Sequence, residues 1–161
     1  MEHIVSDARD ASIRNTATAI SDAVDCFTKL QITTGEDLDS LAKQNGLCGD
    51  WRALGATDEQ LSAWKWDVWN NTWLIRIDES AGPPVITAMT VGSGQAQVGI
   101  QQEAHLLVVC WQVTLDPSVG EPPVTGFECP EQWSANMSAP EVMTMDELKD
   151  AASNLGVTLT G

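Results

Sequence analysis

The sequence lacks several residues and patterns that mark particular classes of protein. It contains no tyrosine, two phenylalanines, two histidines and eight lysines and arginines among 161 residues. No apolar run approaches the roughly 18 residues that a membrane-spanning helix needs. The absence of a CxxC pair and the shortage of histidine argue against a zinc site. We therefore expect no metal, no cofactor and no bilayer-spanning segment within this sequence.

The shortage of basic residues leaves a strong acidic excess. Eight Lys and Arg stand against 23 Asp and Glu, which gives a formal net charge of −15. Such a surface repels phosphate backbones and anionic lipid headgroups, so we expect neither nucleic acid nor a membrane surface as a partner. Solubility is the simplest explanation of the charge. The hydrophobic fraction of 43% indicates one globular domain with its own core, covering residues 1–161.

Motifs of catalytic and calcium sites are also absent. The chain has no G-x-S-x-G, H-E-x-x-H, Walker or EF-hand pattern, so we expect no enzyme and no catalytic residues. The acidic pairs Asp37 with Asp39 and Asp58 with Glu59 offer oxygen ligands for calcium. Without a recognisable loop, a solvated acidic face explains them better.

His105 is the one histidine away from the N-terminus. Cys110 lies five residues further along the same expected strand, so the two side chains point to opposite faces of a sheet. A nucleophile and its base must be in contact, which makes this pair a poor catalytic dyad. A hydrolase that uses His105 is the weakest hypothesis, and it predicts loss of activity in His105→Ala.

Four cysteines are present: Cys26, Cys48, Cys110 and Cys129. An even, widely spaced set favours two disulfides in an oxidising compartment, whereas four buried thiols would fit a cytosolic protein. The simplest pairing joins neighbours in sequence, but all three connectivities remain open. A bridge that closes a loop of about 20 residues contributes roughly 3 kcal/mol.

The N-terminal segment, residues 1–31, has the pattern of a long amphipathic helix. Apolar residues recur in steps of four and three, which predicts one buried stripe. The stripe comprises Ile13, Ala17, Ile20, Val24 and Phe27. Ile4 and Ala8 extend the pattern towards the first residue, so we expect the helix to continue upstream.

Three further short helices are predicted. Residues 34–46 have a capping-box-like start and end at a glycine. Thr57 with Gln60 begins a second, which runs towards Trp64, and Thr144 with Glu147 begins a third, which stops at Gly156. We assign residues 32–62 to a loop with short helices and residues 130–161 to a tail with a short helix.

Residues 63–129 are expected to form an antiparallel sheet. Alternating or continuous apolar residues predict strands, with turns at Asn70-Asn71 and Gly92-Ser93-Gly94. The expected strands are 64–68, 73–77, 85–91, 95–100, 105–115 and 124–128. The fold class is therefore α+β, with a long N-terminal amphipathic helix packed on an antiparallel β-sheet and short additional helices.

Seven tryptophans occur, and four of them gather between residues 64 and 73. We expect a Trp-rich hairpin there. Core packing explains most buried tryptophans, but an exposed indole is a suitable surface for stacking a sugar or docking a protein. Trp66, Trp69 and Trp73 are the candidate adhesion surface.

The stretch SDARDASIRNTATAISDAV, residues 6–24, resembles the segment of type IV pilins that follows their membrane-spanning helix. Cys110 and Cys129 bracket a strand, a loop and a return, which is similar to the disulfide-bounded loop of many pilins. In that family the preceding hydrophobic helix anchors the subunit and later forms the filament core. The resemblance implies that this upper half lies upstream of Ile4. About thirty residues after Cys129 and the Trp-rich segment are departures from the family pattern.

The resemblance leads to a structural hypothesis. The chain is expected to be the head of an exported type IV pilin or pseudopilin subunit, located in a cell-surface filament. Its partners would be other copies of itself or related pilins, and the isolated head would be monomeric. The alternative is a free-standing secreted binding or inhibitory module that uses the Trp-rich hairpin or an acidic face.

Overall fold

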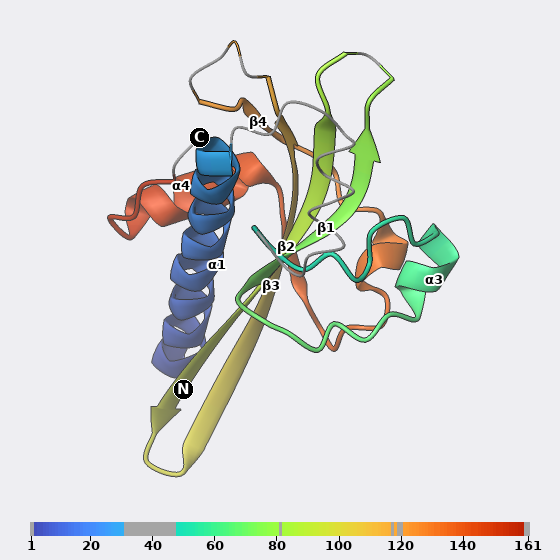
Figure 1. Ribbon diagram of the computed structural model, residues 1–161. Coiled ribbons are helices and arrows are strands. Elements are labelled where there is room, and N and C mark those ends of the chain that lie inside the picture. Colours follow the sequence, from blue (N-terminus) through green and yellow to red (C-terminus); the bar gives the residue numbers. More distant parts are fainter. Residues whose placement is uncertain (1, 31–47, 81, 117, 119–120, 160–161) are drawn as a thin grey trace.

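The computed structural model describes residues 2–30, 48–80, 82–116, 118 and 121–159. Two helices cover one face of a five-stranded sheet, and two short helices with irregular segments cover the other (Figure 1). The first pair is α1 (Glu2–Leu30) and α4 (Met145–Asn154), and the second is α3 (Asp58–Ser62) and the 3-10 helix η1 (Glu131–Ser134). The predicted α+β class, with a long N-terminal helix packed on the sheet, is confirmed.

The sheet is a meander with one short addition. Its strands are β1 (Asn71–Asp78), β2 (Val85–Val98), β3 (Gln101–Thr114), β4 (Val124–Gly126) and β5 (Glu141–Met143). The strands β1 to β4 pair antiparallel in chain order, and β5 pairs parallel with β3. Because β2 occupies one edge of β3 along its whole length, β4 and β5 follow one another on the other edge.

Helix α1 packs on β2 and β3 through the predicted apolar stripe, all of which is buried. The approach is close because β2 carries two glycines below the helix. A Cβ at Gly94 would meet the backbone oxygen of Ala8 and the backbone nitrogen of Ser12. A Cβ at Gly92 would meet the side chain of Thr16. Glycine is therefore required at both positions, by the helix backbone above Gly94 and by the Thr16 side chain above Gly92.

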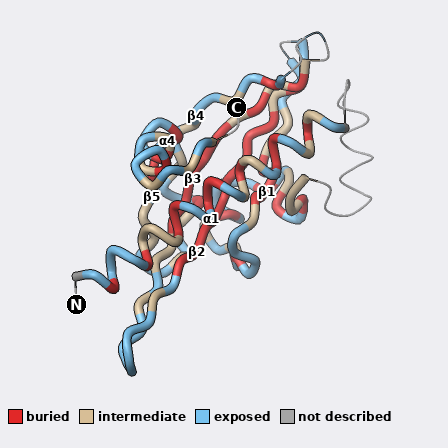
Figure 2. Tube along the Cα trace, turned by 90° about the vertical axis from the view of Figure 1, so that its left-hand side faces the viewer, coloured by how far each residue is buried: buried red, intermediate tan, exposed pale blue. Residues whose placement is uncertain are grey.

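The two faces of β3 have different neighbours. Leu107, Val109 and Trp111 belong to the core below α1, whereas Val108 and Cys110 belong to the core on the other face. This is the period of two expected of a strand buried on both sides. Beyond the core, β2 and β3 continue as a projecting hairpin arm, residues 95–104, whose tip is exposed (Figure 2).

Helices α3 and α4 begin as their sequences predicted. Thr57 with Gln60, and Thr144 with Glu147, form capping boxes in which each side chain bonds the other residue's backbone N–H. Helix α4 ends before Gly156, which has a positive φ of 76°. The helix predicted at 34–46 lies outside the described residues.

Two expected features are wrong. Residues 64–68 form no strand, because Asp50 already bonds the outer edge of β1: its N–H donates to Thr72 and its carbonyl accepts from Leu74. Gly92-Ser93-Gly94 is not a turn but part of β2, and the turn comes at residues 99–100. The glycines serve the close approach of α1 rather than a change of chain direction.

Candidate functional site

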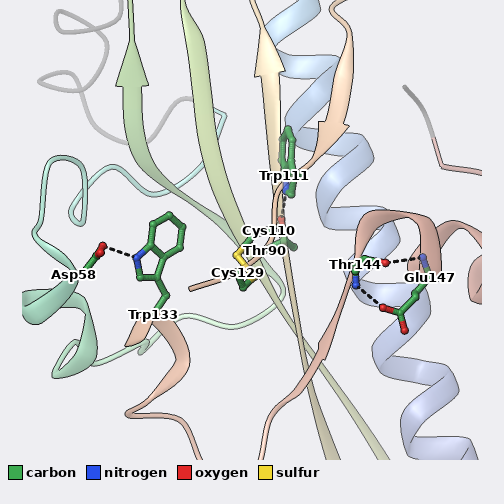
Figure 3. Close-up of a disulfide and its surroundings, with 8 residues drawn as sticks. All are labelled: Asp58, Thr90, Cys110, Trp111, Cys129, Trp133, Thr144 and Glu147. Carbon is green, nitrogen blue, oxygen red and sulfur yellow. Dashed lines mark hydrogen bonds between the residues drawn. A yellow bond between two sulfur atoms is a disulfide. The ribbon is translucent and has the colours of Figure 1, made fainter. Parts of the chain in front are cut away.

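The structure contains both disulfides that sequence order favours. Cys26 joins Cys48 and Cys110 joins Cys129, each with a Cα–Cα distance of 5.3 Å. The first ties α1 to the segment before α3. The second, which Figure 3 shows, ties β3 to the segment before η1. Two disulfides are typical of a secreted protein. Among the described residues, no helix combines the length and the apolar character needed to cross a bilayer.

Of the acidic residues considered as calcium ligands, the structure describes Asp58 and Glu59, and these are not part of a metal-binding group among the described residues. Asp58 bonds Arg76 and the indole Nε1 of Trp133, at 3.1 and 2.9 Å. Asp37 and Asp39 lie outside the described residues. Within the described ranges, no group of three or more His, Cys, Asp or Glu side chains is placed to hold a metal ion.

His105 is part of an ionic cluster at the edge of the sheet. Glu141 in β5 accepts two hydrogen bonds from Arg9 in α1, at 2.9 and 3.1 Å, and lies 2.7 Å from Nε2 of His105 in β3. The pKa of the Glu141 carboxyl is lowered because Arg9 donates to it; partial burial opposes the shift and His105 adds to it. The cluster joins three elements and has no nucleophile, since the sulfur of Cys110 is in a disulfide.

The three candidate tryptophans do not share one exposed surface. Trp73 is fully buried and Trp66 is 6% exposed, whereas Trp69 is 53% exposed. The rings of Trp66 and Trp73 pack edge to face with centroids 5.1 Å apart. Core packing therefore explains Trp66 and Trp73. Trp69 alone presents its ring to solvent.

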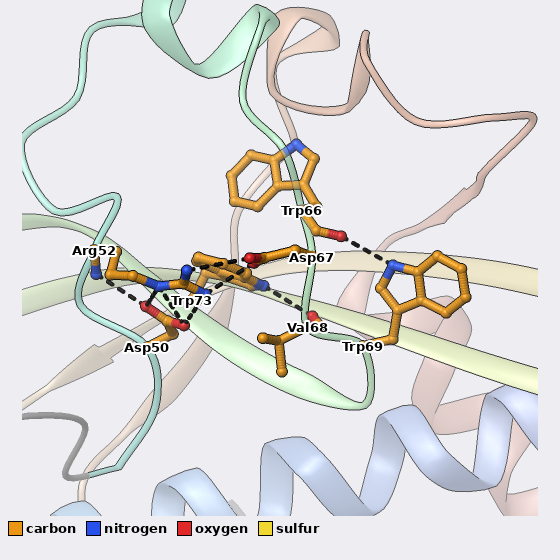
Figure 4. A network of polar contacts seen from close by, with 7 residues as sticks. All are labelled: Asp50, Arg52, Trp66, Asp67, Val68, Trp69 and Trp73. Atoms are coloured by element: carbon orange, nitrogen blue, oxygen red, sulfur yellow. Dashed lines mark hydrogen bonds and ion pairs between the residues drawn. The ribbon is translucent and has the colours of Figure 1, made fainter.

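An arginine clamp holds the segment that carries Trp69. The Arg52 guanidinium bonds the carboxylates of Asp50 and Asp67, each at 2.8 Å, and lies 5.0 Å from the centroid of the Trp73 ring (Figure 4). These bonds lower the pKa of Asp67 and raise that of Arg52. A guanidinium that pairs with two carboxylates and stacks on an indole suits arginine better than lysine.

The Trp69 ring is fixed by its own hydrogen bond. Its Nε1 donates to the backbone oxygen of Trp66 at 3.0 Å. Figure 4 shows the ring turned away from the clamp and from the buried indoles. The Trp66 indole is different: its Nε1 is buried and has no hydrogen-bond partner in the described part of the chain.

A groove of about 640 Å³ lies beside Trp69. One wall is the segment that carries Trp66 and Trp69, another is β3 around His105, and a third is residues 136–139 after η1. Its uncharged polar side chains are Ser93, Asn136 and Ser138. We call it the Trp69 groove.

A second groove, also of about 640 Å³, lies between the first turns of α1 and the hairpin arm. It is lined by residues 4–6, Arg9 and residues 101–103. Three large apolar side chains near it are exposed: Val5 at 47%, Val98 at 63% and Ile100 at 100%. The exposed surface of this groove is also more apolar than that of the Trp69 groove.

Comparisons with known proteins give no match: no family model, no curated protein and no solved structure matches this chain. Function is therefore inferred from the residues themselves and from the resemblance of residues 6–24 to type IV pilins.

Sequence reasoning missed the partners of the candidate residues. Arg9 and Glu141 are 132 positions apart, and Arg52 and Asp67 are 15 apart, with no shared motif. Asn136, which donates to the backbone oxygen of Trp64 at 2.9 Å, lies in a stretch without regular periodicity. Only the high density of tryptophan pointed towards the Trp69 groove.

Proposed function

We propose that this chain is the head of an exported type IV pilin-like or pseudopilin-like filament subunit. The observation that carries the proposal is the arrangement of α1, a 29-residue helix laid across an antiparallel meander. This is the layout that the pilin resemblance of residues 6–24 implies. The order of helix, loop, sheet and the Cys110–Cys129 disulfide is also the order that the resemblance implies.

The distribution of charge along α1 supports assembly at its N-terminal end. Its solvent-facing side carries mainly charged and hydroxyl side chains along its length: Asp7, Arg14, Thr18, Asp22, Asp25 and Lys29. Such a stripe does not drive lateral apolar packing. At the N-terminal end, by contrast, Val5 is exposed beside an apolar-lined groove and the arm tip. We infer that an apolar helix continuing α1 upstream would pack with its copies, while the acidic surface points outward.

In this proposal the protein acts by assembly and not by catalysis. Its partners are other copies of itself or related pilins, and its location is the cell surface. The isolated head is a monomer, because the proposed polymerising segment lies upstream of it.

The test is to fuse a pilin-type leader and apolar helix in register upstream of Ile4 and express the fusion in a host that assembles type IV pili. Immunogold electron microscopy with antibodies to the head should show labelled filaments. Correctly oxidised, exported fusion protein that never forms filaments would overturn the proposal.

The matched control inserts two prolines between the added helix and α1. Proline removes a backbone donor and clashes with the preceding turn, so the helix would be interrupted without any change to the head. We expect export of this variant but no labelled filaments.

The exposed Trp69 favours a second candidate, a free-standing secreted binding module. The codons upstream of this segment in its gene discriminate between the two. A prepilin-like leader followed by an apolar run supports the filament subunit. A conventional cleaved signal peptide supports the secreted module.

A further inference from the structure

We propose that the Trp69 groove is a binding site for an uncharged oligosaccharide. The proposal rests on this chain alone and does not depend on filament assembly. Its first support is the groove itself, about 640 Å³ of concave surface with a 53% exposed indole on its wall. Concave surfaces with an aromatic wall and a few polar groups are typical of small-ligand sites.

The second support is the rigidity of the Trp69 ring. A solvent-exposed tryptophan usually loses side-chain entropy when it binds a ligand. Here the Nε1–H of Trp69 is already bonded to the backbone oxygen of Trp66, which lies in a segment held by the arginine clamp. The ring is therefore preorganised, and less entropy is lost when a ligand stacks on it.

The third support is the charge of the groove. Its titratable lining residues are Lys65, Asp67 and His105, and the formal charges of Lys65 and Asp67 cancel, although the whole chain carries −15. Arg52 pairs with Asp67 but also with Asp50, so the two cations and two carboxylates around this wall still sum to zero. Because the groove has no net formal charge, it attracts neither an anionic nor a cationic ligand, although the molecule as a whole is acidic. The chemistry that remains is an uncharged ligand with both apolar and polar surface.

The fourth support is the set of polar groups without partners. The hydroxyls of Ser93 and Ser138 and the side-chain oxygen of Asn136 line the groove and bond to no other described residue. Together they offer donors and acceptors around an indole face. A pyranose matches this arrangement, because its C–H face lies against the negative face of the ring while its hydroxyls reach the polar rim.

The test measures binding of three neutral probes: cellohexaose, maltohexaose and chitohexaose. Amide and indole signals are followed by NMR as each probe is raised to about 10 mM, a range suited to millimolar affinity. We expect at least one probe to shift the indole signal of Trp69 and the side-chain amide of Asn136. Oligogalacturonate, an anionic probe, should bind more weakly than the best neutral probe.

Two substitutions make the test specific. Trp69→Ala should weaken binding by about tenfold or more, because the stacking surface is lost. Val68→Ala is the matched control: Val68 is 40% exposed, does not line the groove, and keeps the backbone oxygen that accepts from Trp73. The control should bind as the wild type does.

Any one of three results would overturn the proposal. These are the absence of shifts with every neutral probe, binding that is unchanged in Trp69→Ala, and a preference for the anionic probe. Failure of the filament fusion would leave these readouts unaffected, so the two proposals are tested separately.

Discussion

The two faces of the sheet are buried by different means. On one face, the helices α1 and α4 pack mainly on small and aliphatic side chains, and α1 comes close enough to require Gly92 and Gly94. On the other, short helices and irregular segments cover the strands with indole rings, among them Trp66, Trp73 and Trp133. Each face also has one disulfide: Cys26–Cys48 joins α1 to the segment before α3, and Cys110–Cys129 joins β3 to the segment before η1.

The two faces also differ in how completely their polar groups are paired. The helix-covered face has its polar groups paired: the Trp111 indole donates to Thr90 at 2.9 Å, and the Thr90 hydroxyl also bonds Thr72 at 2.8 Å. The indole-covered face leaves the Trp66 nitrogen unpaired among the described residues and carries the Trp69 groove. Buried groups that lack partners are uncommon in well-packed scaffold. We propose that the α1 face serves as scaffold and that the other face contacts ligand.

The largest expected effects come from the disulfides. Their cysteines are 22 and 19 positions apart, so loop-closure entropy predicts nearly equal losses of about 3 kcal/mol in the free energy of unfolding. Removing the Cys110–Cys129 pair by alanine should cost more than removing Cys26–Cys48, because Cys110 is fully buried. Urea unfolding followed by tryptophan fluorescence measures both. A smaller loss for the Cys110 pair would contradict this ranking.

Substitution of Gly94, which lies below α1, is expected to destabilise the protein more than substitution of a glycine elsewhere in the sheet. Gly94→Ala places a methyl group against the helix backbone and should destabilise the protein by about 2 kcal/mol. Gly126→Ala in β4 is the control, since its Cβ would meet Met145 at an ordinary 3.4 Å. The control should stay within about 0.5 kcal/mol of the wild type. Equal thermal-unfolding midpoints for the two variants would show that α1 does not sit so close.

The paired and unpaired indoles should respond differently to the same substitution. Trp111→Phe removes ring volume and a hydrogen bond to Thr90, whereas Trp66→Phe removes ring volume and an unpaired donor. We expect Trp111→Phe to cost more by about 1 kcal/mol, the net value of one hydrogen bond. Chemical denaturation of the two variants measures the difference. An equal or greater cost for Trp66→Phe would remove this distinction between the faces.

The smallest expected effect is the pH dependence of the Arg9–Glu141 pair. Since the folded-state pKa of Glu141 is lowered, its stabilisation is complete above the ordinary glutamate pKa of about 4.3 and is lost as the pH falls below it. Glu141→Gln should therefore lower stability at neutral pH by up to about 1 kcal/mol, a limit set by its partial exposure. The difference from wild type should shrink as the pH falls through the lowered pKa of Glu141 and vanish below it. A difference that grows on acidification, in urea titrations at several pH values, would contradict the lowered pKa.

Local patterns in the sequence predicted the elements that depend on local chemistry. The stripe from Ile13 to Phe27 and the capping boxes at Thr57 and Thr144 each lie within a few turns of one helix, and all appear in the structure. The long strand around Cys110 was predicted because it is apolar on both faces. These features need no knowledge of what packs against them.

The errors occurred where a distant segment decides the outcome. Gly92-Ser93-Gly94 has the composition of a turn, but α1 lies over it and uses the glycines as a contact surface. The alternation at 64–68 is typical of a strand, but Asp50 occupies the edge of β1 where it would pair. Trp69 was a candidate on composition alone; its groove is made by residues 136–139, about seventy positions away, which no local pattern reveals.

The most direct test of the account is to map the cysteines by mass spectrometry of non-reduced peptides from freshly purified native protein. An exported head with each face of its sheet tied by one disulfide predicts Cys26–Cys48 and Cys110–Cys129 as the oxidised pairs. Four free thiols would contradict export, and with it both the filament subunit and the secreted module.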